Sequence, residues 1–164
     1  MAKAYVTRVG GGPLPTELAG DEARALRQAG QEFGATTGRP RRCGWLDLPA
    51  LRWAARVGGM RWLALTKLDV LGGRERIPVC EAYRLRGERL EILPPEPDDL
   101  AAVEPVYREV RGFPRLTGSE RVFEDLPLGA RDYVRLIERA LEVDVCLVST
   151  GPGREATITR RPIV

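Results

Sequence analysis

The chain has 164 residues, which is enough for one domain with a real core, and no apolar run approaches the roughly 20 residues that a membrane span needs. Its 26 lysines and arginines are nearly balanced by 23 aspartates and glutamates, and these charges are interspersed along the chain. We therefore expect neither a nucleic-acid partner nor a membrane partner. The chain contains no histidine, which excludes a histidine general base, a histidine metal ligand and every histidine-containing triad.

The cysteines indicate a reducing compartment. Cys43, Cys80 and Cys146 are isolated and odd in number, which fits buried thiols better than a disulfide framework or a zinc site. Residues 1–7 run directly into strand-like sequence, so we expect no signal peptide and a cytoplasmic protein.

The first half of the chain alternates strand and helix patterns. Residues 4–9 predict a strand that the run Gly-Gly-Gly-Pro at 10–13 ends, either as a loop near a ligand or as a plain strand-to-helix turn. Residues 16–30 predict a helix with Gly30 as its stop, and a second helix is expected from Asp47, its N-cap, to Val57. The apolar run 61–66 is typical of a strand covered on both faces, as in a parallel sheet.

The second half continues the same alternation. Its clearest helix is at residues 129–141, where Ala130, Tyr133, Val134, Ile137 and Leu141 share one face. The other expected elements are strands at 77–85 and 90–93 joined by a turn at 86–88, an exposed connector at 94–99, a strand at 103–110, irregular chain at 111–126, a buried strand at 143–148 and an edge strand at 157–159.

These elements predict one α/β domain over residues 1–164. We expect a partial open, mainly parallel sheet with flanking helices and a small antiparallel strand pair. In such sheets ligands bind outside the carboxyl ends of the strands. The loops 34–42, 66–69 and 149–153 are therefore expected to gather there.

Residues 34–42 read as an anion-binding loop. Two glycines and two threonines lead into three arginines, whose planar guanidinium groups bind carboxylates and phosphates through paired hydrogen bonds. A solvated basic turn before a helix is the alternative.

Residues 66–69 and 149–151 could bind a base. Asp69 follows the predicted buried strand, and a carboxylate there can accept hydrogen bonds from N1 and the 2-amino group of guanine, while adenine offers no such pair of donors. A strand end with solvated charges is the alternative, as is a plain turn for Ser149-Thr150-Gly151. Glu32 and the pairs Asp21-Glu22 and Asp98-Asp99 are expected to be solvated surface.

Four co-linear motifs extend this interpretation. Residues 5–18, 32–47, 65–71 and 148–152 closely resemble, in order and approximate spacing, the C-terminal part of adenylosuccinate synthetase. That family couples IMP and L-aspartate with GTP: GTP phosphorylates the purine 6-oxygen, and the aspartate amine then displaces the phosphate.

The resemblance implies roles for particular residues. A mobile loop would receive aspartate and contact IMP, and this loop consists of Ala35, Thr36, Thr37, Gly38, Arg39, Pro40 and Arg41. Val9 would line the IMP pocket. The GTP contacts would come from Arg41, near the phosphates, and from Lys67, Leu68, Asp69, Ser149, Thr150 and Gly151, around guanine.

The family's phosphate loop, catalytic aspartate, magnesium site and general-acid histidine belong to an N-terminal part that this chain lacks. We therefore expect a C-terminal fragment or truncated homologue with no catalytic residue and no metal ligand of its own. It would be inactive alone, and a separate N-terminal chain would complete it. Alone, it would bind a partner, self-associate or survive as a smaller repacked domain. The alternatives are a non-catalytic module that binds nucleotide or aspartate, with a regulatory role, and a degenerate fragment.

Overall fold

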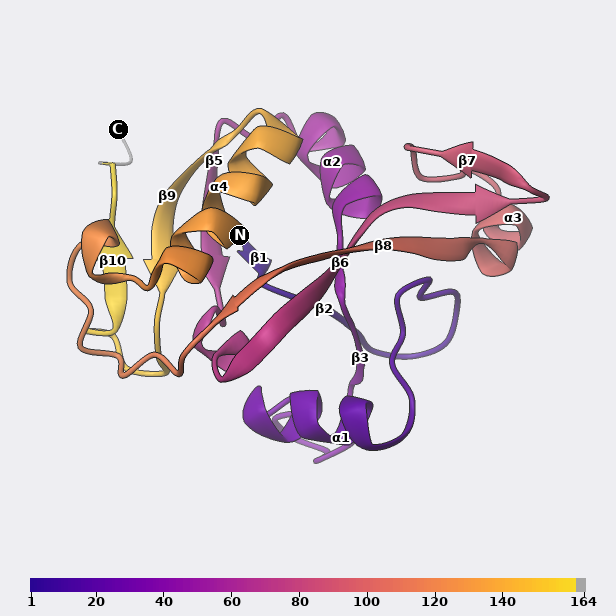
Figure 1. Ribbon diagram of the computed structural model, residues 1–164. Helices are drawn as coiled ribbons and strands as arrows, with labels where there is room; N and C mark the ends of the chain where they lie inside the picture. The colour runs from indigo at the N-terminus through magenta and orange to yellow at the C-terminus, as the bar shows by residue number, and fades with distance from the viewer. Residues whose placement is uncertain (162–164) are drawn as a thin grey trace. The chain divides into compact units, whose positions relative to one another are not determined.

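A computed structural model describes residues 1–161 as two compact units (Figure 1). Unit 1 contains Met1–Ala4, Ala54–Ile77 and the chain from Glu109 onward, and unit 2 contains Tyr5–Trp53 and Pro78–Arg108. This division describes compactness, and the single domain expected over 1–164 stays a prediction.

Unit 1 is built on a mainly parallel sheet. Its order is β1 (Ala2–Lys3), β5 (Trp62–Thr66), β9 (Asp144–Ser149) and β10 (Thr157–Thr159). β5 pairs in parallel with both β1 and β9, while β10 runs antiparallel to β9. The expected mixed α/β fold with an antiparallel strand pair is confirmed. The carboxyl ends of β5 and β9 lie side by side, because Leu65 is in register with Val148.

Helix α4 (Leu128–Leu141) packs against β9 and carries the predicted apolar face. Its first turn lies against β8 (Glu104–Phe113) at two glycines. A Cβ atom added to Gly129 would lie 2.9 Å from the carbonyl carbon of Gly112 and closer still to its oxygen. This close approach of two backbones requires glycine at position 129.

Unit 2 contains several smaller pieces. β2 (Val6–Arg8) and β3 (Arg42–Gly44) form an antiparallel pair, and β4 (Leu46–Asp47) pairs in parallel with β6 (Arg74–Leu85). β6 turns through Arg86 and Gly87 into the antiparallel β7 (Glu88–Leu90), and β8 also pairs with β6. The helices are α1 (Gly20–Ala29), α2 (Leu48–Val57) and α3 (Pro97–Ala102), and short 3-10 turns, both in unit 1, lie at Asp69–Leu71 and Phe123–Asp125. One boundary between the units lies between Ala4 and Tyr5, and the other three fall within α2, β6 and β8.

Several sequence predictions differ from the structure. The strand expected at 90–93 after a turn at 86–88 is β7, which spans Glu88–Leu90. The strand expected at 4–9 is two strands, β1 and β2, separated by the buried residues Ala4 and Tyr5. The helix expected from residue 16 begins at Gly20, because Thr16 and Leu18 instead exchange backbone hydrogen bonds with Trp45 and Cys43. The connector expected at 94–99 contains the first residues of α3, with Pro97 in its first turn, where proline is well tolerated.

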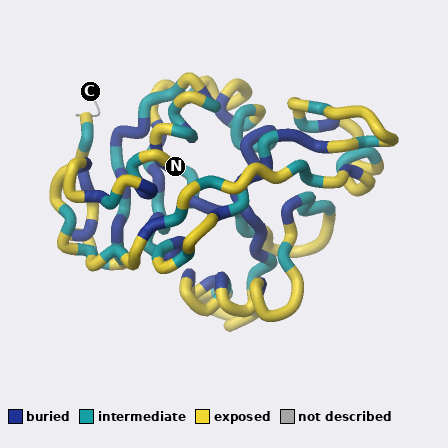
Figure 2. Tube along the Cα trace, viewed as in Figure 1, coloured by how far each residue is buried: buried dark blue, intermediate teal, exposed yellow. Residues whose placement is uncertain are grey.

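The three cysteines are free and buried, as the sequence predicts. Figure 2 shows that most of the exposed chain lies in loops, helix faces and the β6–β7 turn. Within residues 1–161 there is no helix with both the length and the apolar character to span a bilayer.

Asp47 directly precedes α2 and caps it, as predicted. Its Oδ1 accepts the backbone N–H of Ala50 at 3.0 Å and the phenol of Tyr83 at 2.6 Å, and only 2% of the residue is exposed. Burial raises the pKa of the Asp47 carboxyl, although both hydrogen bonds oppose the shift. The ionised carboxylate therefore weakens the folded state near neutral pH.

Replacing Asp47 by asparagine keeps an acceptor for both donors and removes the ionisation. We expect Asp47→Asn to be more stable than the parent at pH 7, by on the order of 1 kcal/mol. Because the folded-state pKa is raised, the parent's deficit should be absent below the unfolded-state pKa and grow as pH rises through the folded-state value. Urea unfolding of both proteins from pH 3 to 8 measures this difference, and a constant difference would contradict it.

Candidate functional site

Two of the loops singled out by sequence meet in unit 1. A hollow of about 240 Å³ is lined by Asp69, from the loop after β5, and by Thr150 and Gly151, from the loop after β9. The loops meet because β5 and β9 are adjacent parallel strands, so both loops leave the same edge of the sheet. The third loop, 34–42, belongs to unit 2 and lies between α1 and β3.

Asp69 is half-buried at the start of a 3-10 turn. Burial raises the pKa of its carboxyl, while backbone N–H groups of Asp69 and Val70 and the charge of Lys67 oppose that shift. Lys67 has a left-handed backbone (φ 62°), and Leu68 is fully buried. The loop thus offers a desolvated acceptor at Asp69, and Leu68 packs inside.

The loop after β9 is held by its own hydrogen bonds. The backbone N–H of Thr150 donates to Ala156 O at 2.9 Å, and the Ser149 hydroxyl donates to Gly151 O at 3.0 Å. A Cβ on Gly151 would lie 3.1 Å from that of Ala156, so a larger residue would crowd this wall of the hollow.

Sequence analysis missed a further wall of the hollow. Leu116, Thr117 and Gly118 line it, together with Pro152, Gly153, Glu155 and Ala156. The Thr117 backbone N–H and hydroxyl both donate to Glu120. Burial acts to raise the pKa of the Glu120 carboxyl, but these bonds and those from the backbone of Glu120 and Gly118 together hold it below its usual range. The run Thr117-Gly118-Ser119 was the available signal, but it lies in a stretch without hydrophobic periodicity.

Loop 34–42 is a compact turn in unit 2. Gly34 N–H donates to Arg39 O and Gly38 N–H donates to Gly34 O, each at 2.8 Å, and Gly38 has the positive φ (63°) that glycine allows. Residues 35–40 are exposed, including both threonines and Arg39. The loop therefore presents hydroxyl and guanidinium donors to solvent.

Glu32 corrects a sequence prediction. It is fully buried, whereas solvated surface was expected. Its Oε2 accepts Arg41 Nη1 and its Oε1 accepts the phenol of Tyr5, at 2.8 and 2.6 Å. The sequence hides this burial because Gln31, Glu32 and Phe33 follow the end of α1, where no helical periodicity applies.

Val9 is 79% exposed beside a loop that two arginines shape. Arg8 donates to the carbonyl oxygens of Gly11 and Pro13, and Arg42 donates to those of Gly10 and Gly12. Arg42 also forms an ion pair with Glu17, which lowers the pKa of that carboxyl. The backbone next to Val9 is thus held by side chains from the neighbouring strands β2 and β3.

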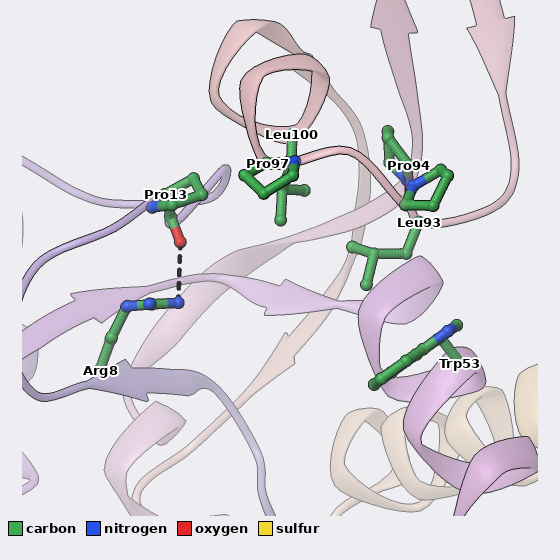
Figure 3. A pocket seen from close by; sticks show the side chains of 8 residues that line it. Arg8, Pro13, Trp53, Leu93, Pro94, Pro97 and Leu100 are labelled. Atoms are coloured by element: carbon green, nitrogen blue, oxygen red, sulfur yellow. Dashed lines mark hydrogen bonds between the residues drawn. The ribbon is translucent and has the colours of Figure 1, made fainter.

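A second hollow in unit 2, of about 440 Å³, is mostly apolar (Figure 3). Trp53, Leu93 and Leu100 project into it. At its rim, Arg8 Nη1 donates a hydrogen bond to the carbonyl oxygen of Pro13. It lacks the converging polar groups that orient a substrate, and sequence analysis did not anticipate it.

Within residues 1–161, no three His, Cys, Asp or Glu side chains form a group that could hold a metal ion.

Comparison with known proteins agrees with the motif order. The family profile described as adenylosuccinate synthetase matches residues 1–158. Adenylosuccinate synthetase from Salinibacter ruber is 52% identical over 159 residues, which is 97% of this chain and 36% of that protein. The enzyme of Caldanaerobacter subterraneus is 48% identical over 161 residues, covering 98% of this chain and 38% of that protein.

A solved structure is also similar. The structure of fully ligated adenylosuccinate synthetase from Plasmodium falciparum superposes with a TM-score of 0.92 at 39% identity, covering 98% of this chain and 39% of that one. The chain thus spans well under half the length of the relatives it matches. With matching sequence motifs, a matching profile and a matching fold, the chain belongs to the adenylosuccinate synthetase family.

Proposed function

We propose that this chain supplies the substrate-recognition part of a GTP-dependent ligase that makes adenylosuccinate, GDP and phosphate from IMP, L-aspartate and GTP. The observation that carries the proposal is the hollow where Asp69, Thr150 and Gly151 converge, in a chain of this family. The chain corresponds to the C-terminal part of the family's longer chain and acts in purine nucleotide synthesis in the cytoplasm.

The hollow in unit 1 is the guanine site. The Asp69 carboxylate accepts hydrogen bonds from N1 and the 2-amino group, and the Lys67 stem lies along the base. Leu68 carries the loop inward, and Ser149, Thr150 and Gly151 close the opposite side. The half-buried position of Asp69 supports this role, since a desolvated acceptor left unpaired by adenine makes discrimination strong.

Loop 34–42 is the site for aspartate and part of IMP. Thr36 and Thr37 supply hydroxyl donors, and Arg39 and Arg41 bind carboxylates, with Arg41 also near the GTP phosphates. Ala35, Gly38 and Pro40 shape the loop, and Val9 lines the IMP pocket. The exposure of residues 35–40 and of Val9 supports these roles, because the groups are open to ligand.

In this proposal the chain is inactive alone. The phosphate loop, the general-acid histidine and the magnesium site belong to the remaining length of the family's enzyme, and a separate N-terminal chain would supply them. Self-association of this chain is the alternative, and it would add none of these groups. A non-catalytic module that binds the same ligands is the second candidate. The observation that favours it is the exposed set of hydroxyl and guanidinium donors in loop 34–42, which binding without catalysis would also use. A degenerate fragment would bind nothing.

Calorimetric titration of the chain with GTP and with ATP tests the proposal. We expect GTP to bind at least about tenfold more tightly than ATP, because ATP leaves the Asp69 carboxylate without its two donors. Binding of neither nucleotide would favour the degenerate fragment. Turnover of IMP, aspartate and GTP by the chain alone would overturn its proposed inactivity.

A further inference from the structure

The buried carboxylate of Glu32 lies at the base of loop 34–42 and is fixed from two sides. Its side chain is 1% exposed, yet both oxygens are satisfied, by Arg41 Nη1 at 2.8 Å and by Tyr5 Oη at 2.6 Å. The Glu32 carbonyl oxygen also accepts the Arg41 backbone N–H at 2.9 Å. Backbone and side chain of Arg41 are thus both tied to one residue.

Tyr5 gives this arrangement its rigidity. It is 2% exposed, and its phenol lies against Gly30, where a Cβ would stand 3.1 Å from the ring carbon Cζ and closer to the hydroxyl oxygen. Glycine at the end of α1 therefore makes room for the Tyr5 hydroxyl that holds Glu32.

Arg41 is oriented without being hidden. Arg27, from α1, donates its Nε to Arg41 O at 2.8 Å, which fixes the backbone on the other side. The Arg41 side chain remains 32% exposed, and its Nε is buried with no hydrogen-bond partner among the described residues. The ion pair uses Nη1, so the guanidinium keeps donor capacity for a second anion.

Two roles for Glu32 are physically distinct. As a competitor, Glu32 would release Arg41 to the ligand, and removing the carboxylate would tighten binding. As a support, it would hold Arg41 while the ligand binds, and removing it would weaken binding. Release would break the ion pair of a carboxylate whose side chain is only 1% exposed, and breaking a buried ion pair is strongly unfavourable. The burial of Glu32 therefore favours support.

We propose that Glu32 is a positioning residue that holds the Arg41 guanidinium in place for an incoming carboxylate or phosphate, with Tyr5 holding Glu32 in turn. This rests on the proposed role of loop 34–42 and adds to it. Because the pair is neutral overall, Arg41 recognises the ligand through the direction of its N–H groups more than through long-range attraction.

The Glu32→Gln variant tests this, with L-aspartate as the probe. In ¹⁵N NMR of the 164-residue chain without ligand, we expect hindered rotation of the Arg41 guanidinium in the parent and free rotation in Glu32→Gln. We expect the affinity for L-aspartate to fall about fivefold or more, since orientation must then be established on binding. Glu81→Gln is the matched control, because it removes the same charge from the exposed Glu81–Arg89 pair of the β6–β7 hairpin.

Tyr5→Phe is a milder second variant that keeps the test possible if Glu32→Gln does not fold. It leaves the ion pair and removes one hydrogen bond, so we expect a smaller loss of both hindered rotation and affinity. Unchanged affinity with a lowered unfolding midpoint would overturn the proposal in favour of a purely structural Glu32, and tighter binding would overturn it in favour of competition. If the parent itself does not bind L-aspartate, the proposed function of the loop fails. In that case equal guanidinium rotation in parent and Glu32→Gln would overturn the positioning role too.

Discussion

The Asp69→Asn variant is expected to bind GTP about 100-fold more weakly than the parent chain, which corresponds to about 2.7 kcal/mol. The carboxylate presents two acceptors to N1–H and the 2-amino group, whereas asparagine presents one acceptor and one donor. The amide N–H₂ would then face a donor of guanine, so one charge-assisted hydrogen bond is lost and one repulsive contact is gained. Calorimetry measures the loss directly.

Xanthosine triphosphate makes the test specific. Xanthine carries a carbonyl oxygen where guanine has the 2-amino group, so an asparagine amide can donate to it while still accepting from N1–H. We expect Asp69→Asn to prefer xanthosine triphosphate over GTP. Asp98→Asn, an exposed change of the same kind on α3, should keep the parent's preference. Equal GTP binding by the parent and Asp69→Asn would remove Asp69 from the guanine site.

Acidification should reproduce part of this effect. Burial raises the pKa of Asp69, so the carboxylate takes up its proton at a pH above the usual range for aspartate. Protonation removes an acceptor, and GTP affinity should therefore fall as pH is lowered through that raised pKa. This dependence should be missing in Asp69→Asn.

The Gly129→Ala variant is expected to lower the free energy of unfolding by about 3 kcal/mol or more. Two effects oppose each other here. Alanine is favoured over glycine in a helix by about 1 kcal/mol. Against this, the new Cβ would lie 2.9 Å from the Gly112 carbonyl carbon and 3.1 Å from Arg111 O, and backbone atoms of a paired strand cannot swing aside as a side chain can. We expect the steric clash to cost more than the gain in helix propensity, so the variant should be less stable than the parent.

Urea unfolding measures the loss in Gly129→Ala. Gly11→Ala is the matched control, since a Cβ at Gly11 meets nothing within 4 Å. It should change stability by less than about 1 kcal/mol. A Gly129→Ala protein that is more stable than the parent would show that helix propensity dominates and that α4 and β8 can separate slightly at no cost.

The fold was predictable where one local pattern decided the structure. The spacing of Ala130, Tyr133, Val134, Ile137 and Leu141 predicted α4. The apolar run at 61–66 predicted a strand covered on both faces, as in a parallel sheet, and β5 pairs in parallel with a strand on either side. The same run placed Asp69 beside Thr150, because adjacent parallel strands release their loops at one edge. Local periodicity could not predict where the chain changes sheets at Ala4 and Tyr5, since an unbroken β-type sequence is compatible with one strand or two.

The site was less predictable where partners are distant in sequence. Glu32 is buried through Tyr5, 27 residues away, and no charge pattern near Glu32 reveals that contact. Thr117 and Gly118 reach the hollow of unit 1 from a stretch without periodicity. The roles of Arg39, Arg41 and Lys67 stay predictions, since they depend on ligands.

The three buried thiols allow local opening of the two units to be measured separately. Cys146 lies in unit 1, while Cys43 and Cys80 lie in unit 2, and burial raises the pKa of Cys80 to about 12. A thiol-specific dye can react only when the surrounding packing opens. The rate at which each thiol reacts therefore reports local opening of the chain around it. Cys146 reports on unit 1, which contains the proposed guanine hollow, and Cys43 and Cys80 report on unit 2, which contains loop 34–42.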